Sequence, residues 1–441
     1  VVGGNESKGY DVENSLRFNK GDSPRLSRTP SSEGNRKTWS YSTWFKRGNL
    51  KSSGSMNFIS AGAQSGTNGT GIQTNNDAIR LIHDDGTPFF TFQSSQVLRD
   101  VAAWYHLLVT CDTTDGTAGD RIKFYLNGNN ITSDMSYTNG SAPSQNSDLR
   151  INDDGAHNIG ARSYHNDNFF DGYMAETHLI DGTVKAPTDF GEFDDNGVWI
   201  PKKYTGTYGT NGFYLEFKQT GTSANSSGIG ADTSGNDNHF AVTNLASTDI
   251  TEDTCTNNFA TMNPLDKSGD DITLSEGNLA GTWSNNNGHS MQGTIGVSTG
   301  KWYYEAKYGT GNIFLGFLNL DRDNTYNGYN YIPALGTKVT TFSYTTASYG
   351  ATASVGDIIG VALNLDDGEI TFYKNGSTQG TAFTSIPSGT YAPHFGYAGG
   401  STGGTATEMN FGNPSFSISS GNNDGKYGNF EYAPPSGYYA L

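Results

Sequence analysis

The same short pattern ends a strand in each half of the chain, and it restricts the fold more than any other feature. Phe124–Gly128 reads Phe-Tyr-Leu-Asn-Gly, and Phe372–Gly376 reads Phe-Tyr-Lys-Asn-Gly. Each run follows an apolar segment and an Asp-rich turn. Asn-Gly is a strong hairpin signal, because both residues tolerate positive φ angles. The two runs therefore predict two antiparallel hairpins and, with them, two β-sandwiches in one chain.

Period-two alternation extends this prediction along the chain. Apolar and polar residues alternate in Arg121–Leu126, in Trp302–Lys307 and in Glu369–Lys374. Gly accounts for 58 of 441 residues, aromatic residues for 12% and charged residues for only 16%. This composition is typical of short strands joined by tight turns, and no helical stripe exceeds about two turns. The sequence predicts an all-β protein with two antiparallel β-sandwich domains of jelly-roll type in tandem.

Polar stretches rich in Gly, Ser, Thr and Asn mark a boundary near residues 218–265. Such stretches usually run over the surface between separate cores. We therefore expect two sandwiches separated by a linker and followed by a short extension. The expected ranges of the first sandwich, the linker, the second sandwich and the C-terminal extension are 1–217, 218–270, 271–420 and 421–441.

The charge balance argues against two classes of partner. Lys plus Arg number 27 and Asp plus Glu number 44, which gives a net charge of −17. A phosphate backbone or an anionic membrane surface would be repelled, so we expect no nucleic-acid binding and no membrane insertion. No apolar run reaches the roughly 20 residues needed to span a bilayer. The chain begins at Val1 instead of Met, which is consistent with a gene product that extends beyond both ends.

The two Cys residues predict no disulfide framework. Cys111 shares the apolar face of an alternating strand, so we expect a small buried hydrophobic side chain there. Cys255 lies in a polar stretch in another part of the chain, and a disulfide between the two finds little support. Two Cys residues are too few for a disulfide-stapled secreted scaffold.

Acidic clusters are the nearest candidates for catalysis or metal binding, and they have the composition of turns. Glu192–Asp195 is the closest match to the paired carboxylates of a glycan hydrolase, but it lies among Gly and Asn residues. Retaining hydrolases hold two carboxyl groups about 5 Å apart on rigid neighbours. No run matches an EF-hand loop, and the eight His residues lack the spacing of a zinc site. We expect a non-enzymatic protein with no catalytic residue and no metal site.

A run rich in Tyr and Asn is the strongest exposed candidate for ligand binding. It begins at Tyr326 with the order Tyr-Asn-Gly-Tyr-Asn-Tyr, and we expect it in a loop after the strand Ile313–Leu320. Flat rings and amide groups suit stacking and hydrogen bonding with a sugar, or contact with a protein. The alternative is that one or two rings cap the end of the sandwich. The residues expected to bind a ligand are Tyr326, Asn327, Tyr329, Asn330 and Tyr331.

Motifs in the first half resemble, in their order, the laminin-G and concanavalin A-like sandwich superfamily. They span roughly residues 15–200. The motifs are Trp104–Thr110, Phe124–Gly128, Asn158–Gly160, Phe170–Glu176 and His178–Gly182. The resemblance implies a two-sheet sandwich. It also leaves room for one calcium ion in this domain, although we expect no other cofactor.

The second half resembles a SPRY domain, which is also a two-sheet sandwich. The resemblance spans about residues 275–416. The motifs are Gly300–Glu305, Phe314–Phe317, Val355–Leu363, Phe372–Gly376, Gly380–Phe383, Tyr391–Pro393 and Asn410–Gly412. Because SPRY domains bind through loops at one end of the sandwich, the resemblance favours contact at the Tyr-rich run.

Six further stretches lie at sandwich edges and in linkers. They are Ser15–Phe18, Leu26–Pro30, Arg36–Trp39, Gly197–Lys202, Asp232–Asn236 and Asn257–Leu265. Together with the two domains, they resemble a group of structural proteins of tailed bacteriophages, particularly marine ones. The resemblance implies a protein of the virion surface, such as a tail fibre or a capsid-attached fibre. Its implied partners are other virion proteins and a glycan of the host surface. Fibres commonly form homo-oligomers, although the sequence has no coiled-coil heptads.

Two other classes of function stay open at this point. The first is a secreted carbohydrate-binding or adhesion module of non-viral origin, which the lectin-like sandwich would equally serve. The second is a glycan hydrolase, which the absence of a clear carboxylate pair disfavours.

Overall fold

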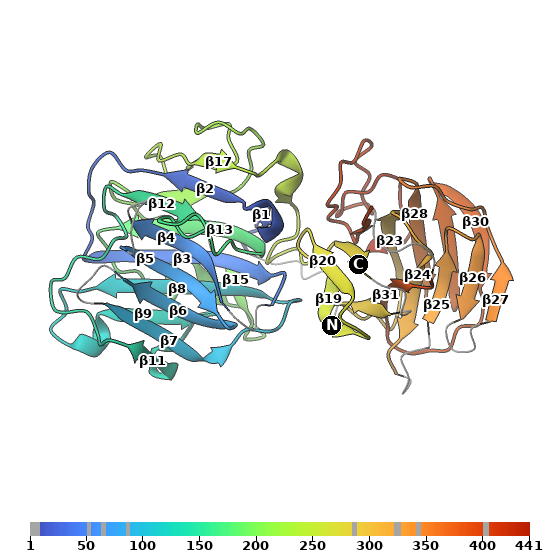
Figure 1. The fold of residues 1–441 in the computed structure, drawn as a ribbon, viewed down its shortest axis with the longest axis horizontal. Helices are drawn as coiled ribbons and strands as arrows, with labels where there is room; N and C mark the ends of the chain where they lie inside the picture. Colours follow the sequence, from blue (N-terminus) through green and yellow to red (C-terminus); the bar gives the residue numbers. More distant parts are fainter. Residues whose placement is uncertain are drawn as a thin grey trace. The chain divides into compact units, whose positions relative to one another are not determined.

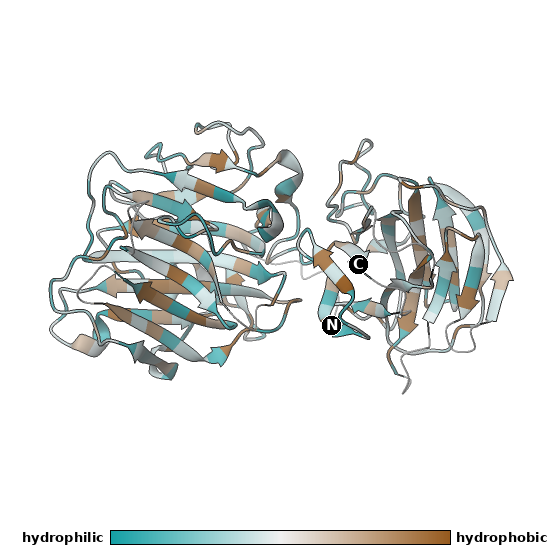
Figure 2. Ribbon diagram, in the orientation of Figure 1, coloured by the Kyte–Doolittle hydropathy of each residue, from teal (hydrophilic) through white to brown (hydrophobic). Residues whose placement is uncertain are grey.

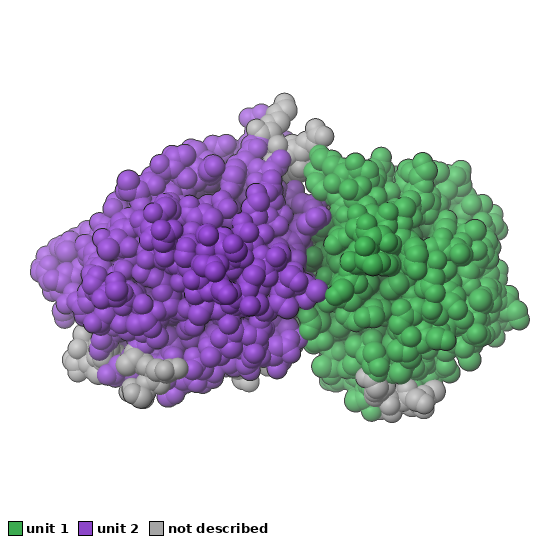
Figure 3. Space-filling view, turned by 90° about the horizontal axis from the view of Figure 1, so that it is seen from above, with its two compact units in different colours: residues 1–4, 259–441 green, residues 5–258 purple. Residues whose placement is uncertain are grey.

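The computed structural model describes residues 9–50, 54–62, 68–84, 89–284, 289–321, 328–340, 345–399 and 405–441. The chain divides into two compact units, which Figure 3 distinguishes by colour. We call Asn5–Asn258 the N-terminal unit and Phe259–Leu441 the C-terminal unit. Apart from the parallel pair β23–β33, the named strand pairs of the described residues are antiparallel, which confirms the all-β prediction (Figure 1).

The N-terminal unit is a sandwich of two sheets. The first sheet has the order β10 (Asn129–Asn130), β9 (Ile122–Leu126), β8 (Trp104–Asp112), β3 (Thr38–Arg47), β13 (Gly172–Asp181), β1 (Ser15–Phe18) and β18 (Ile250–Thr251), with β16 (Phe213–Leu215) also on β13. The second has the order β11 (Met135–Asn139), β7 (Phe90–Val97), β6 (Ala78–His83), β5 (Gly69–Asn75), β4 (Ser55–Gly62), β12 (Ala156–Ile159), β2 (Arg25–Arg28) and β17 (Ala241–Thr243). A separate hairpin joins β14 (Gly191–Phe193) to β15 (Trp199–Pro201).

The C-terminal unit is a second two-sheet sandwich. One sheet has the order β19 (Met262–Lys267), β22 (Ser290–Gly293), β31 (Tyr391–Tyr397), β24 (Ile313–Asn319), β25 (Gly328–Ile332), β26 (Thr337–Thr340) and β27 (Thr345–Ser348). The other has the order β20 (Ile272–Ser275), β21 (Ala280–Trp283), β32 (Thr407–Asn410), β23 (Lys301–Lys307), β28 (Ile358–Asn364), β29 (Glu369–Lys374) and β30 (Ser377–Phe383), with β33 (Tyr439–Ala440) on β23.

Helical structure in the described residues is confined to single 3-10 turns. They are η1 (Lys20–Asp22), η2 (Ala118–Asp120), η3 (Thr132–Asp134), η4 (Pro187–Asp189) and η5 (Ser247–Asp249). No helix in the described part of the chain is long and apolar enough to cross a membrane.

Each sandwich buries one face of its strands in its own core. Figure 2 shows apolar and polar residues alternating along the strands of both units. Phe45 and Val109 are fully buried in the N-terminal core, and Leu315 and Val361 are fully buried in the C-terminal core. Cys111 is buried in the N-terminal core as a free thiol, as its strand position predicted.

The two Asn-Gly turns adopt the same conformation. The φ angles are +47° at Asn127 and +78° at Gly128, and +47° at Asn375 and +76° at Gly376. In each turn the Asn side chain accepts a backbone N–H at 2.8 Å from the neighbouring strand, that of His106 on β8 or that of Ile358 on β28. A Cβ at Gly128 would lie 2.4 Å from the Trp199 ring. The turns therefore need Gly both for its backbone freedom and for the close approach of a ring.

Replacing this Gly should destabilise the N-terminal unit. We expect Gly128→Ala to lower the free energy of unfolding by about 1–3 kcal/mol, because the new Cβ meets a positive φ angle and the Trp199 ring. Gly116→Ala is the matched control, since a Cβ there meets nothing within 4 Å. Urea denaturation measures both variants, and equal stability of the two would contradict this account of the turn.

The segment expected to be a linker belongs to the sandwiches instead. Residues 218–258 supply β17 and β18 to the two N-terminal sheets, and Phe240 is fully buried in the core. Asp253 forms an ion pair with Lys46 at 2.8 Å, with both side chains 0% exposed. Residues 259–270 begin the C-terminal unit with β19. These strands were not predicted from the sequence because their apolar residues are widely spaced among residues typical of turns.

The expected C-terminal extension is likewise part of a sandwich. Phe430 is fully buried, and Leu441 is 2% exposed. Glu305 on β23 is 0% exposed and accepts the backbone N–H groups of Glu431 at 2.9 Å and Tyr432 at 2.8 Å. Burial raises the pKa of Glu305 to about 7, although these donors oppose the shift. A buried carboxylate thus holds the last segment of the chain onto β23.

Removing the anion of the Lys46 pair should destabilise the N-terminal unit strongly. We expect Asp253→Ala to cost about 3–5 kcal/mol of unfolding free energy, because it removes a carboxylate that pairs with the buried Lys46 ammonium. Lys202→Ala, which removes a half-exposed pair with Glu192 at 3.9 Å, serves as the control and should change stability little. Urea denaturation gives both values. A cost no larger than that of the control would show that residues 250–258 are dispensable to this unit.

Candidate functional site

A β-bulge in β13 turns one carboxylate outward. Ala175 pairs with Trp44 and His178 pairs with Ser42, so two residues of β13 lie opposite one residue of β3. Glu176 takes a φ angle of +48°, which non-Gly residues rarely adopt. Bulges of this kind redirect side chains and are common beside functional sites.

The other edge of β13 changes partner at the same point. Strand β1 pairs with β13 up to Met174, and β16 pairs with it from Thr177 onward. Glu176 therefore lies between the ends of two short strands. The chain before β1 and the chain after β16 flank it on either side.

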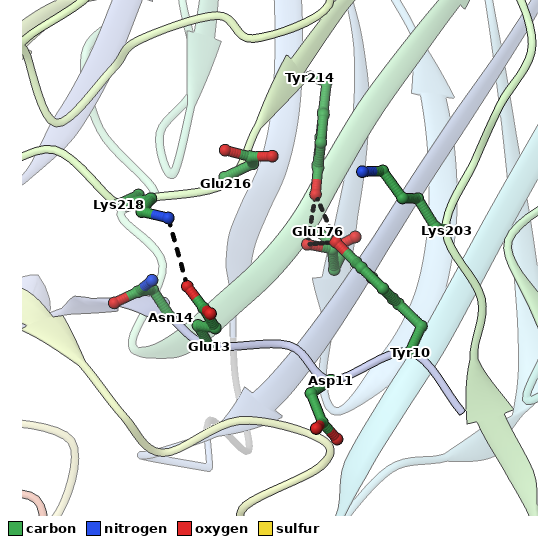
Figure 4. Close-up of a pocket in the computed structure, with 9 residues that line it drawn as sticks. All are labelled: Tyr10, Asp11, Glu13, Asn14, Glu176, Lys203, Tyr214, Glu216 and Lys218. Atoms are coloured by element: carbon green, nitrogen blue, oxygen red, sulfur yellow. Dashed lines mark hydrogen bonds and ion pairs between the residues drawn. The ribbon is translucent and has the colours of Figure 1, made fainter. Parts of the chain in front are cut away.

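This change of partner leaves a pocket of about 180 Å³ on the N-terminal unit. Its lining combines four carboxylates, two ammonium groups, two phenols and an amide. The residues are Tyr10, Asp11, Glu13, Asn14, Glu176, Lys203, Tyr214, Glu216 and Lys218 (Figure 4). The pocket is strongly polar, so it suits a ligand rich in hydrogen-bonding groups.

Two phenols hold the Glu176 carboxylate in place. Tyr214 donates its hydroxyl proton to Glu176 Oε1 at 2.6 Å, and Tyr10 donates to the same oxygen at 3.3 Å. Burial and the Glu176 charge raise the pKa of both tyrosines well above the ordinary value, so both remain protonated donors. The second oxygen, Oε2, lies 3.7 Å from His178 Nε2. Glu176 is 6% exposed, so it is an oriented acceptor at the base of the pocket.

The rim of the pocket carries charges of both signs. Lys218 Nζ lies 3.4 Å from Glu13 Oε2, and both side chains are more than half exposed. Glu216 and Lys203 have no interaction drawn to another lining residue in Figure 4. Burial and the charge of Glu176 raise the pKa of the Glu216 carboxyl, while nearby Lys and His charges oppose the rise.

An aromatic layer covers the outer face of the sheet beside the pocket. His178 stacks on Tyr214 with ring centroids 4.2 Å apart, and Phe190 packs against His178 at 5.4 Å. Farther along the sheet, His106 Nδ1 accepts the indole proton of Trp199 at 3.1 Å, and its Nε2 lies 2.8 Å from Ser42 Oγ. Residues beyond β13 thus close this face and leave the gap between β1 and β16 as the accessible polar site.

Two residues of the predicted ligand site, Tyr326 and Asn327, lie outside the described residues. Tyr329, Asn330 and Tyr331 form part of strand β25 rather than a loop. Tyr331 and Asn330 are 0% exposed, and Tyr329 is half-buried against Phe383. The run Tyr-Asn-Tyr has the period of a strand, so both rings turn toward the core and Asn330 turns away from it. At these three positions the structure fits the alternative, in which the Tyr rings belong to the sandwich.

The acidic run Glu192–Asp195 lies in the β14–β15 hairpin, with Glu192 in β14 and Asp194 and Asp195 in the turn. Asp194 accepts the backbone N–H groups of Asn196 at 2.9 Å and Val198 at 2.8 Å. These backbone donors lower the pKa of Asp194. Within the described ranges, no group of three His, Cys, Asp or Glu side chains is arranged to hold a metal ion.

The pocket residues escaped the sequence analysis because they come from distant parts of the chain. One local signal was available. Met174 and Leu179 are both core residues on one strand, yet an odd number of positions separates them. A regular strand would turn them to opposite faces, so the pattern indicated a bulge near Glu176.

Family comparisons agree with the two folds. Residues 21–188 match the concanavalin A-like lectin/glucanases superfamily, and residues 285–414 match the SPRY domain. The chain therefore carries a concanavalin A-like domain followed by a SPRY domain, in the order that the motifs indicated. Both are binding-type folds, and together they indicate a binding or adhesion module.

Individual relatives match only part of the chain. An E3 ubiquitin-protein ligase, RKP, of Arabidopsis thaliana is 34% identical over 121 residues, which cover 26% of this chain and 9% of the ligase. The SPRY domain of human HERC1 is 15% identical, with a TM-score of 0.30 over 34% of this chain and 96% of that domain. The TRIM65 PSpry domain is 16% identical, with a TM-score of 0.29 over 34% of this chain and 91% of that domain.

The buried His106 should make the N-terminal unit sensitive to acid. Burial, with a smaller contribution from His178, lowers the pKa of His106 to about 3. Below about pH 6.5 the unfolded chain binds the proton more readily, so stability is full above that pH and is lost as the pH falls toward 3. We expect a loss of about 2 kcal/mol at pH 5 from this residue. Urea denaturation at pH 7 and pH 5 should show a smaller loss in His106→Gln than in the wild type, and identical losses would contradict the assignment.

Proposed function

We propose that this protein is a non-enzymatic attachment protein whose N-terminal unit binds a glycan in the Glu176 pocket. The observation that carries the proposal is the Glu176 carboxylate, held by two phenols and opening into a polar pocket of about 180 Å³. A fixed acceptor costs little entropy when a ligand binds, because its orientation is already set.

The chemistry of the lining supports a glycan as the ligand. Carboxylates accept sugar hydroxyl protons, and Lys203 and Asn14 can donate to sugar oxygens. The Tyr10 ring contributes an aromatic surface to the same pocket. The match of this unit to a lectin-containing superfamily agrees with that ligand class.

One observation favours a glycan hydrolase as the second candidate. Glu176 lies on β13 and Glu216 directly follows the neighbouring strand β16, and the pKa of Glu216 is raised by burial and by the charge of Glu176. Hydrolases use such a pair, one carboxyl protonated and one ionised. We prefer binding because Glu176 Oε1 already accepts two phenol protons, which weakens it as a nucleophile or base. Release of reducing ends from a broad polysaccharide panel would decide for the hydrolase.

We further propose that the protein is displayed on a virion surface as part of a tail fibre or a capsid-attached fibre, outside the host cell. Support comes from the stretches that resemble structural proteins of tailed bacteriophages, such as Gly197–Lys202 and Asn257–Leu265. Its partners there would be other virion proteins and copies of the same chain. The net charge of −17 supports the expectation that neither nucleic acid nor a membrane is the target.

The location can be tested on purified particles. Mass spectrometry and antibody labelling should find the protein on virions of the phage that encodes it. Absence from the particles, together with secretion from a bacterial cell, would favour the non-viral adhesion module instead.

Glycan binding can be tested separately with a glycan array. We expect the full chain to bind a defined set of glycans, and Glu176→Gln to weaken binding about tenfold or more, because a charged acceptor is lost. Glu192→Gln, at an exposed position of strand β14, is the matched control and should bind as the wild type does. Tyr329→Ala should also leave binding unchanged if the Glu176 pocket is the site. No binding by the wild-type chain to any glycan would refute the proposal.

A further inference from the structure

Two oppositely charged side chains of the pocket are left for a ligand. Lys218 is engaged by Glu13, and Glu176 Oε1 is engaged by the two phenols. Lys203 and Glu216 line the same pocket, and Figure 4 draws no hydrogen bond or ion pair from either to another lining residue. A donor and an acceptor thus stand on either side of the fixed Glu176 carboxylate.

We propose that the pocket selects an uncharged sugar residue with two adjacent hydroxyl groups, one donating to Glu216 and the other accepting from Lys203. This inference rests on the proposed glycan-binding function. Adjacent hydroxyls on a pyranose ring can satisfy a donor and an acceptor at once, and each such hydrogen bond to an ionised group is stronger than a neutral one. Glu176 Oε2 supplies a further acceptor at the base of the pocket.

The charges of the lining disfavour an acidic sugar. Four carboxylates and two ammonium groups line the pocket, and one ammonium is already paired with Glu13. The carboxylate of a uronic or sialic acid would meet unpaired like charge in a partly desolvated site, which costs free energy.

The same lining disfavours an amino sugar. Glu216 would attract an incoming ammonium group, but Lys203 places a positive charge in the same pocket and would repel it. The ammonium group would also have to give up its water to reach Glu216, a cost that a hydroxyl group largely avoids. An uncharged ring escapes both penalties.

Ligand affinity should fall at a higher pH than it would if Glu216 had the ordinary pKa of a glutamate. The charged and titratable groups that act on Glu216 are Glu176, Lys218, Lys203 and His178. Burial and Glu176 raise the pKa of Glu216, and the three cationic groups oppose the rise. Because the hydroxyl donates to the ionised carboxylate, affinity is full above this raised pKa and falls as the pH drops through it.

The experiment uses the full chain and a panel of methyl pyranosides, with each neutral sugar matched by its uronic acid and its 2-amino derivative. Saturation-transfer NMR identifies binders, and calorimetry gives Kd. We expect a neutral pyranoside with adjacent hydroxyls to bind better than both charged derivatives. Glu216→Gln and Lys203→Met should each weaken that binding about tenfold, and Glu216→Gln should also flatten its dependence on pH. Glu192→Gln is the control variant and should bind as the wild type.

The outcomes separate this inference from the proposed function. Glycan binding that prefers a uronic acid or an amino sugar would overturn the inference and leave the attachment function standing. Binding of a neutral sugar that neither Glu216→Gln nor Lys203→Met alters would do the same. A wild-type chain that binds nothing on the array and nothing in the panel would overturn both.

Discussion

The bulge in β13 is the constraint on which the N-terminal unit depends. Met174 and Leu179 both belong to the core, although an odd number of positions separates them. A regular strand would send one of them to the outer face, so the extra residue keeps both ends of β13 in register with one core. The cost is a positive φ angle at Glu176. The gain beyond packing is that Glu176 faces outward at the point where β1 gives way to β16.

In the C-terminal unit, two short strands also share one edge of a longer strand, but the glutamate at that point is used within the fold. Strand β23 pairs with β33 through Trp302 and Tyr303, and with β32 from Glu305 onward. A buried glutamate again lies where two short strands share one edge. Glu305, however, accepts two backbone N–H groups and the amide of Asn410, so its hydrogen-bonding capacity is used within the fold. Glu176 lacks backbone donors of this kind among its described contacts, which is why we read one junction as structural and the other as a site.

Local patterns predicted the hairpins and the two sandwiches well, because turn chemistry and alternation act over a few residues. The Asn-Gly turns required positive φ angles, and the structure has them at Asn127 and Asn375. The linker was misread because Phe240 and Asp253 are isolated among Gly, Ser and Asn, and their burial depends on distant strands. The loop predicted for the Tyr-rich run is a strand over Tyr329–Tyr331, because the order Tyr-Asn-Tyr has the alternation of a strand as well as the composition of a loop.

The pocket itself could not have been predicted from local sequence. Tyr10, Glu176, Lys203 and Glu216 meet only because β1 and β16 share one edge of β13. That sharing is a property of the topology, and no short motif records it.

One wall of the pocket is the segment that leads into β1, and this couples the site to mechanical load. Strand β1 pairs with β13 over only three residue pairs, and Tyr10 lies just before it. A pull on the N-terminal end of this unit would act first on Tyr10 and then on β1, whose Leu16 and Phe18 are buried in the core. Peeling them away would remove a phenol from Glu176 and open one side of the pocket. Ligand binding at this site would therefore depend on the direction of the applied force, and tension from the N-terminal side would release the ligand.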